Sequence, residues 1–501
     1  MPILSLFHFI GKNKSNREYL WAALGATIVQ FISFKMLYPF PDFFSDSYSY
    51  LFAAQAHLGI NIWPIGYSRF LQFFHWLTHS GTALVAFQYF FLETTALYFF
   101  YTILYFFRPK QSTTYILFIF LFANPLLLYL SNYVNSDPLF AALSLLWFTQ
   151  LIWIIYRPGN ILLFTHAVLL FLCFTVRNNA YYYPLITAIA FLLARKGLRW
   201  KLTGILAPFL LIIPFILYSR NEAFKMTGRH QFSLFTGWQL ANNALYIYRG
   251  LPIDPAGLPS PAARELDSLT RQFDKSLIPD FNGFLDEYVG NFFIREPASP
   301  LKQYLVKNFS IKDDYAGVVA WGKASPVFEE FGIYIIERNP VAYFRDFVWL
   351  NTKNYFAPPL EKLEVYNLGT DQVGKIAADW FGFKNTRVKS ASKDLQGVLL
   401  FVFSPLFFLM NIYLLIWATQ YIIRRKYRTA TPSHHKILLL TGSFLIANFC
   451  FCVFATIIVL RYEVVPLIIG TSISLLLLER YEKIEIQKNV TGELKMSELN
   501  V

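Results

Sequence analysis

The sequence predicts an all-α integral membrane protein with about ten transmembrane helices. Of its 501 residues, 55% are hydrophobic and 15% are charged, and the mean hydropathy is +0.40. Several apolar runs approach 20 residues, the length that a helix needs to cross the hydrocarbon core of a bilayer. The net charge of +13 lies in short clusters between these runs. That pattern is typical of membrane topology and argues against nucleic-acid binding.

Ten apolar segments are long enough to be considered as spans. They cover residues 19–38, 82–107, 113–130, 138–156, 160–176, 180–194, 202–218, 398–420, 437–460 and 464–479. The spans divide the chain into a first membrane module, a polar region, a second group of spans and a polar tail. These four parts are 1–218, 219–397, 398–480 and 481–501.

The basic residues between the predicted spans set the orientation. Threading the chain from a cytoplasmic N-terminus places nineteen Lys and Arg residues on the cytoplasmic side, against Arg69, Arg177 and Arg461 on the outer side. Such an asymmetry indicates which loops stay inside. We therefore expect both termini in the cytoplasm and the polar region outside. The high Phe content and the absence of a C-terminal retrieval signal favour a bacterial inner membrane.

The loop at 39–81, between the first two predicted spans, is too aromatic for a free loop. Residues 45–57 and 67–79 each read as an amphipathic helix, and Gly and Pro residues separate them. Such helices lie in the membrane interface with their aromatic side chains toward lipid. This loop also contributes candidates for a substrate cleft, namely Tyr50, His57, Tyr67 and Arg69.

The polar region 219–397 is the one candidate soluble domain, at about 180 residues. Helical patterns cover 262–275 and 326–338, and Asn339-Pro340 breaks the second pattern. The aromatic segment 341–350 is expected to return along the membrane surface. The region is therefore expected to be mostly helical.

Three carboxylates at the predicted outer face are candidates for chemistry. Asp46 is the first choice as a general base, because acids near lipid are costly and are frequently functional. The alternative is that Asp46 caps the helix beginning at Ser47. Asp42 is the second choice, and Asp137 the third. Since Pro138 follows Asp137, a capping role at the start of a span is equally open for that residue.

Basic side chains at the same face are candidates for binding a phosphate. Arg177 and Arg461 follow spans at their outer ends, and a guanidinium can clamp a phosphate with two hydrogen bonds. The alternatives are snorkelling to the interface or an Arg461–Glu463 ion pair. Further candidates are Lys35 and Tyr462 for the phosphate and Asn178 for the cleft.

Motifs for other chemistries are missing from the sequence. It has no CxxC, HExxH or Walker motif, and no GxGxxG after a strand. Its three cysteines, Cys173, Cys450 and Cys452, all lie in apolar segments. We therefore expect no required cofactor and no nucleotide-driven pump, and the sequence offers no support for a divalent metal, which stays an open alternative.

Several of these segments together resemble the GT-C superfamily of membrane glycosyltransferases. The resemblance rests on Ser45-Asp46-Ser47-Tyr48 with Trp63-Pro64-Ile65-Gly66-Tyr67, on Ser136-Asp137-Pro138, on Thr175-Val176-Arg177-Asn178-Asn179, and on Arg461-Tyr462 with Pro466. It covers roughly the first 220 and the last 100 residues. Each motif is short and variable, and the resemblance rests on the order of the motifs along the chain and on their common position at the predicted outer face.

The resemblance implies transfer of a sugar from a polyprenyl- or dolichyl-phosphate carrier to a glycan, lipid or protein acceptor on the outer face. Asp46 would then act as the base, and Arg177 and Arg461 would face the lipid phosphate. Many relatives carry paired acids in the first loop, whereas serines flank Asp46 here. That departure favours chemistry without a metal.

Two other kinds of protein fit the same topology. An envelope polysaccharide ligase or polymerase also joins many spans to an outer domain and uses outer arginines. A transporter or flippase for lipid-linked glycans would place charges or broken helices at mid-membrane depth. Most charges here gather at one face, which favours an enzyme over a carrier.

Overall fold

The computed structural model describes residues 5–279, 289–425 and 432–479. Most of these residues are helical, and within them no β-strand longer than an isolated bridge is formed. The two bridges pair Asp42 with Tyr133 in parallel and Gln372 with Arg387 in antiparallel. The prediction of an all-α architecture is confirmed.

Seven helical segments in the described part of the chain are long and apolar enough to cross a membrane. They are α2 (Lys14–Leu37), α5 (Gly81–Phe107), α6 with α7 (Gln111–Phe122 and Pro125–Asn132), α8 (Ser136–Tyr156), α11 with α12 (Leu198–Leu206 and Phe209–Thr227), α21 with α22 (Leu395–Leu400 and Phe403–Ile423) and α23 (Pro432–Ala455). Three of the ten predicted spans form shorter helices, which are α9 (Asn160–Val176), α10 (Tyr183–Leu193) and Val464–Glu479.

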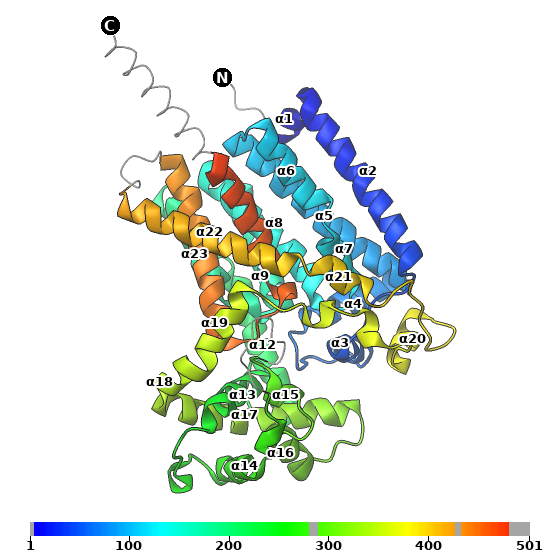
Figure 1. Cartoon of the computed structure of the whole chain (residues 1–501), viewed down its shortest axis with the longest axis vertical. Helices are drawn as coiled ribbons and strands as arrows, with labels where there is room; N and C mark the ends of the chain where they lie inside the picture. The colour runs from blue at the N-terminus through cyan, green and yellow to red at the C-terminus, as the bar shows by residue number, and fades with distance from the viewer. Residues whose placement is uncertain (1–4, 280–288, 426–431, 480–501) are drawn as a thin grey trace.

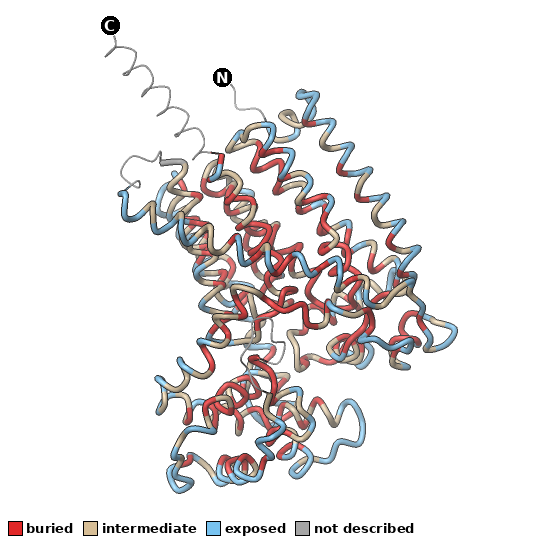
Figure 2. Tube along the Cα trace, viewed as in Figure 1, coloured by how far each residue is buried: buried red, intermediate tan, exposed pale blue. Residues whose placement is uncertain are grey.

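The middle of the bundle is built on α5, α8 and α7, whose inner faces are buried (Figure 2). By contrast, α2 lies at one side and exposes Trp21, Ile32 and Met36, as expected for a helix surrounded by lipid. The start of α1 (Leu6–Lys12) and the C-terminal end of the 464–479 helix lie at one end of the molecule. The helices of the polar region lie at the opposite end (Figure 1).

The loop after α2 forms the two predicted helices, α3 (Ser45–Gln55) and α4 (Gly66–Leu77), each within two residues of its expected bounds. They lie at the same end of the bundle as the polar region (Figure 1). Before α3, Asp42 N donates to Asn132 O at 2.8 Å, and Val134 N donates to Asp42 O at 3.0 Å. This backbone pairing fixes the start of the loop against the segment that precedes α8.

The polar region forms a helical unit. Its helices are α13 (Thr236–Tyr248), α14 (Pro261–Gln272), α15 (Phe292–Arg295), α16 (Pro300–Asn308) and α17 (Asp314–Arg338). The long α13 and α17 pack against each other with Trp238 and Phe328 fully buried between them. After α17, Pro340 begins α18 (Pro340–Tyr343), as the predicted break at Asn339-Pro340 requires.

The predicted helical pattern at 326–338 forms the second half of α17, which begins 12 residues earlier and so holds Pro326 in its interior. Proline in a helix interior leaves the carbonyl four residues earlier without its N–H partner. Here that carbonyl is Gly322 O, and Gln231 Nε2 donates to it at 2.7 Å. A side chain from outside the helix therefore replaces the missing backbone bond.

From α18 the chain returns to the bundle through a π-helical turn, Phe344–Val348, and α19 (Trp349–Phe356). The segment after α19 then runs beside the first loop. Tyr366 Oη donates to Pro41 O at 3.2 Å, and Asn367 N donates to Asp42 Oδ1 at 2.8 Å. This return path is what brings residues of the polar region to the functional site.

Candidate functional site

Seven charged side chains meet where the first loop, the bundle and the return segment come together. We call them the ion cluster. Its acids are Asp46, Asp137 and Glu361, and its bases are Arg177, Arg295, Lys362 and Arg461.

Arg461 is the centre of the ion cluster. Its Nη1 lies 2.9 Å from Asp137 Oδ2 and 4.0 Å from Asp46 Oδ2, and its Nε lies 3.4 Å from Glu361 Oε2. Only 3% of its side chain is exposed. A buried guanidinium is costly unless carboxylates surround it. The three acids therefore explain how the charge of Arg461 is accommodated.

The other three bases complete the ion cluster. Arg177 forms an ion pair with Asp137 Oδ1. Lys362 Nζ lies 3.5 Å from Asp46 Oδ2 and 3.9 Å from Glu361 Oε1, and Arg295 Nη1 lies 3.5 Å from Glu361 Oε1. Burial lowers the pKa of Lys362, the guanidinium groups nearby act in the same direction, and Asp46 and Glu361 oppose them.

Local structure directs each acid into the ion cluster. Asn135 caps α8 by accepting from Ser136 N, so that Asp137 in the first turn is free to bind the two arginines. On α3, the side chain of Ser47 accepts from Phe44 N, and Asp46 is likewise left for Lys362 and Arg461. Asn135 therefore takes the capping role considered for Asp137, whereas no side chain caps α3 and Asp46 lies inside its first turn.

Aromatic rings pack against the cations of the ion cluster. Lys362 Nζ lies 4.3 Å and Arg461 Cζ 5.1 Å from the centre of the Phe44 ring. Tyr462 lies between the two arginines, at 4.1 Å from Arg177 Cζ and 4.6 Å from Arg461 Cζ. Cations over aromatic faces are attracted by the ring quadrupole, and more strongly when desolvated.

The three carboxylates differ in how accessible they are. The side chain of Asp46 is 15% exposed, against 2% for Asp137 and 1% for Glu361. Asp137 and Glu361 are therefore enclosed by cations, whereas an incoming molecule can reach Asp46. With four bases and three acids, the ion cluster has a formal charge of +1 (four minus three). It can neutralise one further negative charge.

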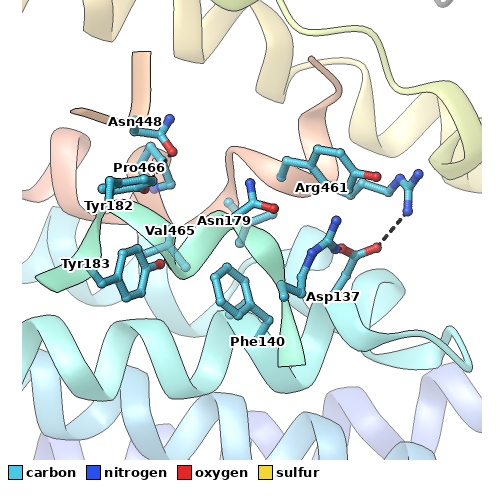
Figure 3. Close-up of a pocket in the computed structure, with 13 residues that line it drawn as sticks. Asp137, Phe140, Asn179, Tyr182, Tyr183, Asn448, Arg461, Val465 and Pro466 are labelled. Carbon is cyan, nitrogen blue, oxygen red and sulfur yellow. Dashed lines mark hydrogen bonds and ion pairs between the residues drawn. The ribbon is translucent and has the colours of Figure 1, made fainter. Parts of the chain in front are cut away.

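A narrow pocket extends from the ion cluster into the bundle. Asp137 and Arg461 line one end, and Tyr182 and Asn448 line the other (Figure 3). Arg177, which pairs with Asp137, also lines the pocket. Its remaining walls are mainly apolar and come from α8, from α10 with the turn before it, and from residues 464–466. The pocket thus connects a charged end to an apolar interior.

Glu463 lies beside this pocket without pairing to Arg461. Asn448 Nδ2 donates to Glu463 Oε2 at 2.7 Å, and Tyr182 Oη donates to Asn448 Oδ1 at 2.9 Å. The Glu463 side chain is fully buried, and burial raises its pKa to about 7. The structure therefore lacks the Arg461–Glu463 ion pair that the sequence left open.

Asp42 and Lys35 lie outside the ion cluster. Besides Asn367 N, which donates to Oδ1, Asp42 is held through its backbone pairing, and it is buried. Burial raises the pKa of Asp42 to about 8, while hydrogen bonds from Asn367 and Tyr133 and the charge of Lys35 oppose the rise. Lys35 Nζ donates to Asn132 Oδ1 at 3.2 Å.

The remaining predicted cleft residues mostly make structural contacts. Tyr50 Oη and Ser136 Oγ share a hydrogen bond of 2.9 Å next to the ion cluster, and Tyr67 Oη donates to Gln88 at 2.8 Å. Arg69 donates to Leu58 O at 3.0 Å, and His57 Nδ1 lies 3.0 Å from Gln72 Nε2. Asn178 lines a second pocket, next to the turn that carries Arg177.

The sequence interpretation missed Arg295, Glu361 and Lys362. All three belong to the polar region, where charged residues are ordinary and no pattern distinguishes them. The available signal was Pro358-Pro359, directly before Leu360 and Glu361, which ends the aromatic helix α19 and turns the chain toward the bundle. This signal indicates that the chain turns after α19, but it does not show which part of the protein the following residues contact.

Comparisons with protein-family models, with curated proteins and with solved structures gave no match.

Proposed function

We propose that the protein is a membrane glycosyltransferase of the GT-C type, which moves a sugar from a polyprenyl-phosphate donor to a glycan, lipid or protein acceptor. The observation that carries the proposal is the ion cluster. One accessible carboxylate, Asp46, lies beside Lys362 and Arg461, whose side chains are largely buried, and the four cations of the ion cluster exceed its acids by one formal charge. This arrangement suits a reaction that needs both a base and an anion-binding group.

The chemistry assigns a role to each side of the ion cluster. Asp46 would accept the proton from the acceptor hydroxyl as its oxygen attacks the anomeric carbon of the sugar. The bond to the phosphate oxygen would break, and the leaving phosphate would gain negative charge. Arg177, Arg461 and Lys362 would stabilise that charge, because donors held in place and shielded from water act strongly on developing charge.

The pocket that continues from Arg177 and Arg461 supports a lipid-linked donor. Its charged end and its apolar walls have the polarity expected for a phosphate joined to a hydrocarbon chain, and with a free volume of about 10 Å³ its walls would have to separate before such a chain could enter. In this proposal the reaction takes place on the outer face of a bacterial inner membrane, with both termini in the cytoplasm and no metal required.

The test is sugar transfer by the full-length protein in membranes, from a panel of radiolabelled polyprenyl-phosphate sugars. Asp46→Asn removes the base while keeping the size of the side chain, and should lower transfer about 10²- to 10⁴-fold. Asp314→Asn is the matched control, since Asp314 is an exposed acid in the first turn of α17. Full activity in Asp46→Asn would exclude the proposed base, and no transfer from any donor would exclude the proposed reaction.

A further inference from the structure

A second pocket lies on the other side of the turn that carries Arg177. Asn179 lines the first pocket, whereas Asn178 lines the second. The opposite walls are the segment of the first loop around Trp63 and the part of α12 around Ser219. Two pockets thus share one short wall, next to an arginine of the ion cluster.

Close packing of the first loop on α9 forms this second pocket. A Cβ atom on Gly66 would lie 2.5 Å from Thr175 O, so the loop approaches the end of α9 as only a glycine allows. That approach brings Trp63 to the pocket, where its ring lies 4.7 Å from the ring of Phe235.

Three aromatic rings that pack on one another form another wall of the second pocket. The centre of the Phe174 ring lies 5.8 Å from that of Phe232 and 6.4 Å from that of Phe215, and the last two lie 6.2 Å apart. On the same span as Phe215, Leu217 is 60% exposed, as expected for a residue that faces lipid. The pocket therefore lies beside the membrane, at the end of the bundle that carries the ion cluster.

The polar groups in the second pocket are neutral, and two of them are available. Ser219 is 4% exposed. Neither its hydroxyl nor the amide of Asn178 makes a side-chain hydrogen bond within the described residues. A buried serine in a helix usually donates to the carbonyl four residues earlier. No charged side chain from the described residues lines this pocket.

We propose that the second pocket binds an uncharged sugar, either free or as the headgroup of a lipid. The free volume of this pocket is about 20 Å³, so the pocket admits one hydroxyl-bearing edge of a sugar and not the whole ring. The amide and the hydroxyl would bond to that edge, while aromatic side chains would contact the C–H face of the ring at the mouth of the pocket. A charged sugar would lose hydration there without meeting a counter-charge. The role of this pocket as the acceptor site of a glycosyltransferase rests on the proposed function. The proposal that it binds a sugar does not depend on that function.

The test is photolabelling of the full-length protein in phosphatidylcholine nanodiscs. The probe is an alkyl β-glucoside with a diazirine on the sugar ring, and labelled peptides are mapped by mass spectrometry. We expect labels within 60–65 or 215–233. Asn178→Ala and Ser219→Ala should each lower this labelling about threefold to tenfold, the effect of one lost hydrogen bond. Leu217→Ala, on the exposed face of α12, should leave it unchanged.

Further photolabelling probes distinguish the classes of ligand that could occupy the second pocket. Equal labelling of the second pocket by an alkyl diazirine without a sugar would overturn the proposal in favour of a lipid tail. Equal labelling by the corresponding alkyl glucuronide would overturn the requirement for a neutral sugar, and labels only elsewhere would overturn the site. Competition by methyl glucoside would support a free sugar, and competition only by alkyl glucosides would support a lipid headgroup.

The proposed function and the sugar-binding proposal can be contradicted independently of each other. Labelling of the second pocket should persist in Asp46→Asn, because Asp46 is not among its lining residues. A protein that is labelled there but transfers no sugar from any donor contradicts the proposed function alone. A protein that transfers sugar but is never labelled there contradicts the inference alone.

Discussion

At Glu361 the backbone adopts φ +54°, a left-handed conformation that is unusual for a residue with a long side chain. This conformation directs the carboxylate toward Arg295, Arg461 and Lys362. Strained backbone persists where the surroundings determine it. Here the attraction between the Glu361 carboxylate and the three cations compensates for the cost of the left-handed backbone.

Replacement of Glu361 by Gln should separate stability from anion binding. The change raises the formal charge of the ion cluster from +1 to +2, so the folded state should lose about 1–3 kcal/mol. Inorganic phosphate should raise the Tm of the variant more than that of the wild type, because the phosphate replaces the missing negative charge. Thermal unfolding with and without phosphate measures both effects. Glu364→Gln, at an exposed position in the same segment, should change neither.

Asp42 should make the stability of the protein depend on pH. Its pKa is about 8 in the folded state, against about 3.9 in an unfolded chain. Between these values the folded state keeps a proton that the unfolded state has lost, so stability falls as the pH rises from about 4 to about 8. In Asp42→Asn this slope of Tm against pH should flatten. An unchanged slope would show that Asp42 is already ionised in the folded protein, and the exposed Asp371 provides the control through Asp371→Asn.

At the scale of elements, the contact between the first loop and α9 depends on one glycine. Gly66→Ala would place a methyl group against the backbone oxygen of Thr175, which cannot move as a side chain would. We expect a loss of about 1–3 kcal/mol, as for other overpacked sites. Gly25→Ala is the control, because Gly25 lies inside α2 and a Cβ atom added there would meet no atom within 4 Å. It should stabilise by roughly 0.5–1 kcal/mol. Equal Tm values for the two variants would contradict the close approach at Gly66.

The elements were largely predictable, since apolar runs and helical periodicity are local signals. All ten predicted apolar segments fall on helices, as do both amphipathic segments of the first loop. The extension of α17 before Pro326 was not predicted and has a nonlocal cause, because the hydrogen bond from Gln231 that permits a proline there comes from 91 residues away in the sequence.

The sequence predicted only in part which residues lie close together at the site. Asp46, Asp137, Arg177 and Arg461 each lie at the end of an apolar segment, so topology alone placed them at one face. Glu361 and Lys362 join them because the chain after α19 returns along the first loop, through contacts such as Tyr366 with Pro41. No local pattern encodes that path, and the roles of these residues remain predictions.

At the scale of the whole molecule, the charge pattern assigns the two ends of the bundle to opposite sides of the membrane. Val306, on α16, and Arg424, just after α22, are both exposed. In a variant without Cys173, Cys450 and Cys452, a cysteine at position 306 should react with an impermeant maleimide in intact cells. A cysteine at position 424 should react only after permeabilisation. The reverse pattern would invert the orientation and contradict an outward-facing site.

The centre of the ion cluster has a consequence for the biosynthesis of the protein. Asp46 and Asp137 are made early, whereas Arg461, which contacts both, lies more than 300 residues after either of them. During synthesis Asp137 can pair with Arg177 and Asp46 with Lys362, but the arginine that joins these acids in one cluster is added only just before the last helix. A chain that stops before residue 461 retains nearly all of its hydrophobic segments and the cations Arg177 and Lys362, but it lacks the cation that contacts all three acids, so the ion cluster cannot be completed. Such truncated chains should be preferred substrates for membrane proteases, so that the last part of the chain also serves as a checkpoint for completed assembly.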